Sequence, residues 1–147
     1  MVRLPVNVLV VDDEEDFVEM FSLRLQEIGE NVTGVFSGRE GLDALEKGDF
    51  DVVVLDIKMP GMDGIETLKE IRRRFPLVEV ILLTGHGSVD TAVAGMKLGA
   101  YDYINKPADF AEFQEKLEGA RRRKVEQEER IRRAEARTLS RKSGDMF

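Results

Sequence analysis

Residues 6–16 read VNVLVVDDEED, a largely apolar run that ends in five consecutive acidic residues. Two other short runs rich in Val, Leu and Ile, residues 52–55 and 78–83, likewise lack a regular alternation of polar and apolar positions. Runs of this kind are typical of strands buried on both faces, as in the centre of a parallel sheet. Weaker runs at 31–36 and 101–105 are predicted to form the edges of the same sheet.

Segments with helical periodicity lie between and after these runs. Four of the five predicted helices have an apolar face, formed by Phe17, Met20, Phe21, Leu25 and Ile28; Ile65, Leu68, Ile71 and Phe75; Val89, Ala92, Val93 and Met96; and Phe110, Phe113, Leu117 and Ala120. Capping boxes are predicted for two helix starts, at Ser37 with Glu40 and at Asp63 with Glu66. Helix ends are predicted at Gly29, Pro76 and Gly99.

This strict alternation of strand and helix predicts a three-layer α/β fold with right-handed crossovers. The first strand is strongly apolar and the second weak, which favours a flavodoxin-like (βα)5 doubly wound parallel sheet with strand order 2-1-3-4-5. A functional site is then expected at the carboxyl ends of the strands, where strands one and three are neighbours.

Composition excludes several classes of protein. The chain has 147 residues, 42% hydrophobic and 35% charged, with a net charge of -7 and no cysteine. A disulfide scaffold, a thiolate metal site and a cysteine nucleophile are therefore excluded. No apolar run approaches the roughly 18 residues that span a bilayer, and the acidic residues at 12–16 are incompatible with a signal peptide. We expect a cytoplasmic protein without membrane contact.

The net charge is unevenly distributed. Residues 1–118 carry a charge of -12 and residues 119–147 a charge of +5. We predict a globular domain over 1–118 and a charged helical extension or linker over 119–147, whose last residues, 143–147, are expected to fray. Glutamates four residues before arginines support a helix. Because acidic and basic residues alternate there, a solvated or dimerising helix is favoured over direct DNA binding.

Acidic residues follow two of the central strands. Asp12 and Asp13 come after the first strand and Asp56 after the third, so the predicted topology brings three carboxylates together. Two unit charges about 4 Å apart repel by about 4 kcal/mol at an effective dielectric constant near 20. A bound cation would relieve this repulsion, and an oxygen-only site with few carboxylates suits Mg²⁺ better than Ca²⁺. The alternative is that these residues are solvated loop acids.

The other strands end in groups that suit a phosphoryl ligand. Thr84 ends the fourth strand and Lys106 the fifth. A hydroxyl and an ammonium beside carboxylate-bound Mg²⁺ can hold phosphoryl oxygens. Taken singly, Thr84 is most often an ordinary strand-end hydroxyl and Lys106 a surface lysine, so the prediction depends on their convergence at one edge of the sheet.

Four motifs now resemble a known family. The segments VLVVDDE (8–14), VVVLDIKMPGMDG (52–64), ILLTGHG (81–87) and AYDYINKP (100–107) are similar to those of bacterial response-regulator receiver domains of two-component systems. The resemblance covers about residues 4–118. It implies a signalling domain, not an enzyme, that catalyses its own Mg²⁺-dependent phosphorylation by a histidine kinase or phosphotransfer protein and slowly loses the phosphoryl group.

The resemblance also implies roles for individual residues. Asp56 would be the phosphoacceptor, and Mg²⁺ would be bound by Asp13, Asp56 and the Lys58 backbone carbonyl, with Asp12 acting partly through water. Lys106 and Thr84 would bind the phosphoryl oxygens. Thr84 and Tyr103 would form the conformational switch, and the peptide bond before Pro107 would be cis. For Tyr103, an ordinary packing role is equally compatible.

Other readings remain open at this point. One rival is a degenerate receiver that acts as a phosphorylation-independent interaction module. A Mg²⁺-dependent phosphatase or flavodoxin-like binder is disfavoured, because Lys58 stands where a second carboxylate would follow Asp56 and no glycine-rich phosphate loop is present. His86, the one histidine, is either an exposed loop residue or a modulator of phosphoryl lifetime, and Met59 and Met62 either pack the loop or contact a partner.

The resemblance also bears on how the domain would pass its signal to an output partner. Residues 84–107 look most like receivers that precede AAA+ transcriptional activators or belong to hybrid signalling proteins. The chain is expected either to act alone through protein contacts or to end inside a linker helix before an output domain. Homodimers could form through the face built by residues 88–118 or through the C-terminal helix.

Overall fold

The structure is a computed structural model that describes residues 3–59, 62–85, 89–106 and 109–145. Five parallel strands form one sheet in the order β2-β1-β3-β4-β5. The elements are, in chain order, β1 (Asn7–Val11), α1 (Glu15–Glu27), β2 (Asn31–Val35), α2 (Gly38–Lys47), β3 (Val52–Asp56), α3 (Gly64–Arg74), β4 (Glu79–Thr84), α4 (Val89–Lys97), β5 (Asp102–Asn105) and α5 (Phe110–Asp145). The predicted fold class and strand order are confirmed.

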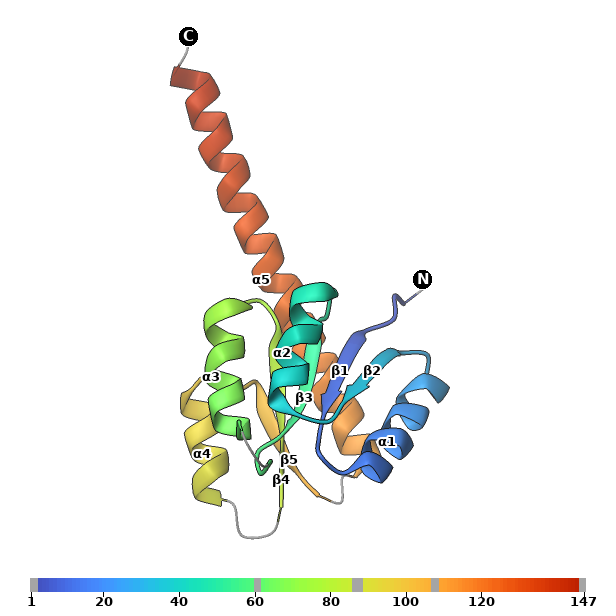
Figure 1. Ribbon diagram of the computed structural model, residues 1–147. Helices are drawn as coiled ribbons and strands as arrows, with labels where there is room; N and C mark the ends of the chain where they lie inside the picture. The colour runs from blue at the N-terminus through green and yellow to red at the C-terminus, as the bar shows by residue number, and fades with distance from the viewer. Residues whose placement is uncertain (1–2, 60–61, 86–88, 107–108, 146–147) are drawn as a thin grey trace.

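The sheet is the middle of three layers (Figure 1). Alternate residues of each central strand enter two separate cores: Val8 and Val10 pack with α1 and α5, whereas Leu9 and Val11 pack with α2 and α3. All positions of β3 and β4 are buried. The absence of alternation in these strands follows directly, since both of their faces are covered.

Local signals set several of the helix boundaries. The Ser37 hydroxyl accepts a hydrogen bond from the Glu40 amide at 3.1 Å, and the Asp63 carboxylate accepts one from the Glu66 amide at 2.8 Å. Both predicted N-caps are therefore confirmed. Gly29 and Gly99 follow α1 and α4 with φ of 93° and 102°, the left-handed conformation that glycine adopts at low cost after a helix.

The predicted apolar faces of α1 and α4 are partly wrong. Met20 and Ile28 are exposed, because the buried stripe of α1 runs through Val18, Phe21 and Leu25. In α4, Val89, Val93 and Met96 are exposed and the buried residues are Ala92 and Gly95. A side chain at position 95 would collide with Leu82, so small residues are what allow α4 to approach β4.

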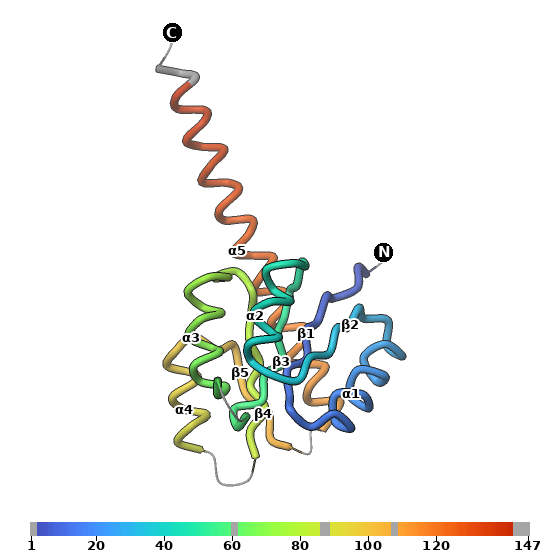
Figure 2. Tube along the Cα trace, viewed as in Figure 1, coloured from blue at the N-terminus to red at the C-terminus, as the bar shows by residue number. Residues whose placement is uncertain are grey.

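The fifth helix is continuous and longer than the body that it packs on (Figure 2). Lys124 Nζ lies 3.0 Å from Asp51 Oδ1, and Arg123 Nε lies 3.1 Å from Glu79 Oε2. These ion pairs hold α5 against the amino ends of β3 and β4, beyond residue 118. From Glu129 to Lys142 every residue is exposed. Over the described residues, no helix combines the length and apolarity that a bilayer crossing requires.

Candidate functional site

Parallel pairing places four predicted site residues at one edge of the sheet. Asp12 follows β1, and its amide donates to the Val35 carbonyl oxygen at 3.2 Å, which extends the pairing of β1 with β2. Asp56 and Thr84 are the last residues of β3 and β4, and the Lys106 amide donates to the Thr84 carbonyl oxygen at 2.8 Å. The backbone positions of these residues are therefore fixed by the sheet.

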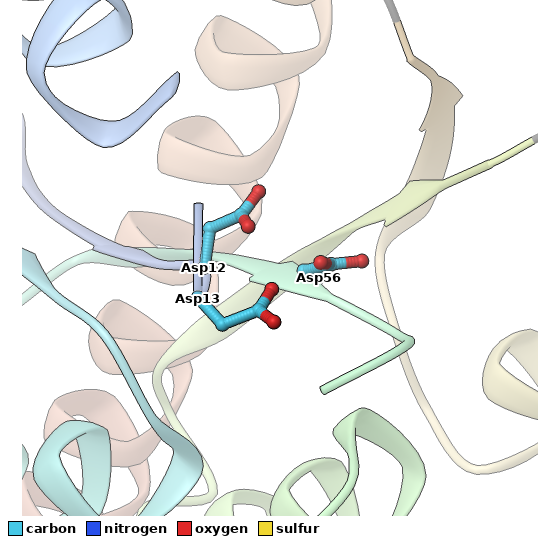
Figure 3. A group of neighbouring side chains, drawn as sticks. All are labelled: Asp12, Asp13 and Asp56. Carbon is cyan, nitrogen blue, oxygen red and sulfur yellow. The ribbon is translucent and has the colours of Figure 1, made fainter. Parts of the chain in front are cut away.

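The three predicted carboxylates come together (Figure 3). Asp12, Asp13 and Asp56 each offer an oxygen, and these oxygens lie within 4.8 Å of one another. Asp12 and Asp56 are buried, whereas Asp13 is exposed to solvent. The cluster therefore has a buried base and an open side.

The loop after Asp56 is held close to this cluster. The Lys58 amide donates to Asp56 Oδ1 at 3.2 Å, which orients the carboxylate. A Cβ at Gly64 would lie 2.4 Å from the Asp56 carbonyl oxygen, so only glycine allows α3 to begin this close to β3. Met59 is buried in the core and Met62 packs beside it, which makes loop packing their observed role.

Lys106 supplies the positive charge of the site. Its ammonium lies 2.5 Å from Asp12 Oδ2, 3.2 Å from Glu14 Oε1 and 3.6 Å from Asp56 Oδ2. Burial lowers the pKa of Lys106, but its close pairing with Asp12 and the charges of Asp56 and Glu14 raise the pKa above its ordinary value. The lysine is therefore charged at neutral pH.

The ionised form of Asp56 is disfavoured in the folded protein. Burial and the neighbouring Asp12 charge raise the pKa of Asp56 to about 6, against the opposing effects of Lys106 and the Lys58 amide. One lysine thus compensates the cluster only in part.

The donor set fits a hard cation. Asp12 Oδ2 is buried and accepts no hydrogen bond from the described residues, although it forms the ion pair with Lys106. Three carboxylates with an exposed member and oxygen-only donors are the ligands that Mg²⁺ prefers, with room for bound water.

The Thr84 hydroxyl bonds to the neighbouring strand. It is buried and donates to Asn105 Oδ1 at 2.8 Å. Asn105, on the neighbouring strand β5, is a contact that sequence reasoning missed. The sequence could have indicated this contact, because Asn105 directly precedes Lys106 and the pairing of β4 with β5 sets Thr84 opposite Asn105.

Tyr103 lies outside the cluster, on the edge strand β5. Its side chain is 40% exposed, and the Lys116 ammonium lies 5.4 Å from its ring centroid. The predicted cis bond at Pro107 and the role of His86 fall outside the described residues, and the ligand role of the Lys58 carbonyl stays a prediction.

Together, these elements define a doubly wound α/β protein with an acidic cluster and an adjacent lysine at the carboxyl edge of its sheet. Residues 8–118 match the response regulator receiver domain family. The chain belongs to this family, a class of signalling domains of two-component systems.

Relatives and solved structures agree with this membership. The transcriptional regulatory protein ZraR of Salmonella typhimurium is 41% identical over 120 residues, which cover 82% of this chain and 27% of ZraR. The crystal structure of a response regulator receiver domain protein from Clostridium thermocellum has a TM-score of 0.78 at 35% identity, covering 82% of this chain and 97% of that one. NtrX from Brucella abortus has a TM-score of 0.81 at 31% identity, covering 86% of this chain and 29% of NtrX.

The chain matches nearly all of an isolated receiver structure but spans only about a quarter of the length of ZraR. The similarity therefore concerns the receiver domain and not the rest of ZraR.

Proposed function

We propose that Asp56 is the phosphoacceptor of this receiver domain, in a reaction that depends on Mg²⁺. The observation that carries the proposal is the position of the Asp56 carboxylate. It is buried beside Asp12, 3.6 Å from the Lys106 ammonium, at the open carboxyl edge of the sheet. Asp12 and Asp13 would hold the cation together with Asp56 and the Lys58 carbonyl.

The chemistry follows from these groups. An Asp56 oxygen attacks the phosphorus of a phosphohistidine, and the P–N bond breaks with its electron pair passing to the imidazole nitrogen. The Lys106 ammonium would form an ion pair with the phosphoryl oxygens. The Thr84 hydroxyl would donate a hydrogen bond to them after breaking its bond to Asn105. When bound, Mg²⁺ neutralises the charge that the phosphoryl group adds to an acidic site. The same residues would catalyse slow hydrolysis of the product.

The partners belong to the same proposal. A sensor histidine kinase or a phosphotransfer protein would supply the phosphoryl group, in the cytoplasm where ATP charges such donors. By analogy with ZraR, which is named a transcriptional regulatory protein, the output would be transcription, through an output domain or a separate partner. The exposed apolar residues of α4 with Tyr103, or the projecting part of α5, would provide a dimer surface. Direct DNA binding by α5 is disfavoured.

The chain retains all five residues that phosphorylation would require: Asp12, Asp13, Asp56, Thr84 and Lys106. This favours a phosphorylatable receiver over a degenerate one. The match to the receiver family spans residues 8–118 and so includes all five of these residues, which disfavours the phosphatase and flavodoxin-like alternatives.

The direct test is incorporation of phosphate from a small-molecule donor such as phosphoramidate. Intact mass measurement should show one added phosphoryl group in the presence of Mg²⁺ and none when EDTA is in excess. The loss follows because the acidic cluster, uncompensated, repels the incoming anion. Labelling that persists in EDTA would contradict the Mg²⁺ requirement, and no labelling under any condition would favour the degenerate receiver.

The switch makes a separate prediction. Phosphorylation should draw the Thr84 hydroxyl away from Asn105 and turn the Tyr103 ring from solvent toward the space that Thr84 leaves. The chain has two tyrosines and no tryptophan. In a Tyr101→Phe background, acrylamide quenching of Tyr103 fluorescence should therefore fall on phosphorylation. The Thr84→Ala variant is the control, and unchanged quenching in the Tyr101→Phe protein would remove Tyr103 from the switch.

A further inference from the structure

Lys106 has a fourth neighbour besides its three carboxylates. Its ammonium lies 4.5 Å from the centroid of the Phe17 ring on α1. This distance is within the range of a cation–π interaction, in which the negative face of an aromatic ring attracts a cation. The lysine side chain is 16% exposed, so the contact is largely shielded from water.

The Phe17 ring is itself held in place. It stacks on Phe21 with ring centroids 5.2 Å apart, and Phe21 meets Phe113 of α5 edge to face at 4.7 Å. Phe21 and Phe113 are core residues with exposures of 5% and 0%. The half-buried Phe17 ring is thus the outermost member of an aromatic cluster that is anchored in the core between α1 and α5.

Lysine needs such a support because its side chain is flexible. Ordering a long side chain costs conformational entropy, and the sheet fixes only the backbone of Lys106. Among its carboxylate partners, Glu14 is 67% exposed, so that ion pair is screened by solvent. An aromatic face attracts the ammonium without adding an anion that would compete with a phosphoryl group for it.

We propose that Phe17 is a positioning residue for Lys106: its ring, braced by Phe21, holds the ammonium beside Asp56 where phosphoryl oxygens would bind. The inference rests on the proposed function for its consequence, but the contact itself can be measured in the unphosphorylated protein. In this proposal Phe17 acts on the phosphoryl group through Lys106, the one member of the site whose contact with its ring is measured.

The chain offers a well-matched set of variants. Phe17→Leu removes the ring face and keeps an apolar side chain, whereas Phe17→Tyr keeps the ring. Phe110→Leu is the control, because Phe110 belongs to the same cluster but its ring faces Arg24, 4.3 Å away. All three changes affect half-buried positions, and thermal unfolding monitors their folding.

The first measurement is the NMR spectrum of protein labelled with isotopic lysine. The ring current of Phe17 should move the Lys106 ε-methylene protons upfield, and Lys106→Met identifies the signal. The upfield shift should disappear in Phe17→Leu and remain in Phe17→Tyr and Phe110→Leu.

The second measurement is the initial rate of labelling by phosphoramidate with Mg²⁺. Among these three variants the rate should fall only in Phe17→Leu, by about 3- to 10-fold, as expected for loss of one cation–π contact.

The outcomes separate the role of Phe17 from the proposed function. An unshifted Lys106 signal in the wild type, or equal rates in Phe17→Leu and the wild type, would overturn the inference and leave the proposed function intact. A Phe17→Tyr variant as slow as Phe17→Leu would show that the ring face is irrelevant and would also overturn it. A wild-type protein that takes up no phosphate would instead contradict the proposed function, whatever the NMR spectrum shows.

Discussion

The Asp56→Asn variant is expected to take up no phosphate from phosphoramidate in the presence of Mg²⁺. An amide oxygen is a far weaker nucleophile than a carboxylate, and the other two carboxylates of the cluster, Asp12 and Asp13, are the proposed ligands of Mg²⁺. Intact mass measurement over the time that labels the wild type completely should therefore show only the unmodified variant.

Asp63→Asn is the matched control for this experiment. Asp63 lies in the same loop but is exposed, and its side chain caps α3, a role that asparagine also fills. This variant should be labelled like the wild type. If Asp56→Asn were labelled as fast as Asp63→Asn, another residue would be the acceptor.

The same Asp56→Asn change should stabilise the fold when no divalent cation is present. A shift in the pKa of Asp56 from 3.8 to about 6 means that ionising this group costs more in the folded than in the unfolded chain. Since one pKa unit corresponds to about 1.4 kcal/mol, the free energy of unfolding at pH 7.5 should rise by about 2 to 3 kcal/mol in the variant. Urea unfolding in EDTA measures this difference.

The pH dependence has a definite sign. Between about pH 4 and 6 the folded wild type binds more protons at Asp56 than the unfolded chain does, so its stability falls as the pH rises through this window. The advantage of Asp56→Asn should therefore be present above pH 6 and vanish near pH 4. Mg²⁺ should stabilise the wild type more than the variant. If the variant were less stable than the wild type at pH 7.5 in EDTA, the ionised Asp56 carboxylate would not be the destabilising group that its raised pKa indicates.

Much of the fold could be predicted because the decisive signals are local. The uninterrupted apolar runs around Val10, Val54 and Leu82 predicted central strands, and the side chains of Ser37 and Asp63 capped their helices as their spacing indicated. The errors arose where tertiary packing overrides hydrophobicity. Periodicity alone could not show that α4 packs through Ala92 and Gly95, leaving larger apolar residues exposed.

Other parts of the structure depend on contacts distant in sequence. Lys124 was one of several charged residues in a polar segment, yet it is buried against Asp51, 73 positions earlier. The convergence of Asp12, Asp13, Asp56 and Lys106 could be predicted because the topology alone brings strand ends together. The partners of individual side chains, such as Asn105 for Thr84 and Phe17 for Lys106, required the three-dimensional arrangement.

The most direct test of the central claim is to locate the phosphoryl group. The wild-type protein would be labelled with phosphoramidate and Mg²⁺, reduced with borohydride to convert the acyl phosphate to homoserine, and digested for peptide mass spectrometry. We expect the conversion at Asp56 alone. Conversion at Asp12 or Asp13, or a stable phosphate on any hydroxyl side chain, would contradict it.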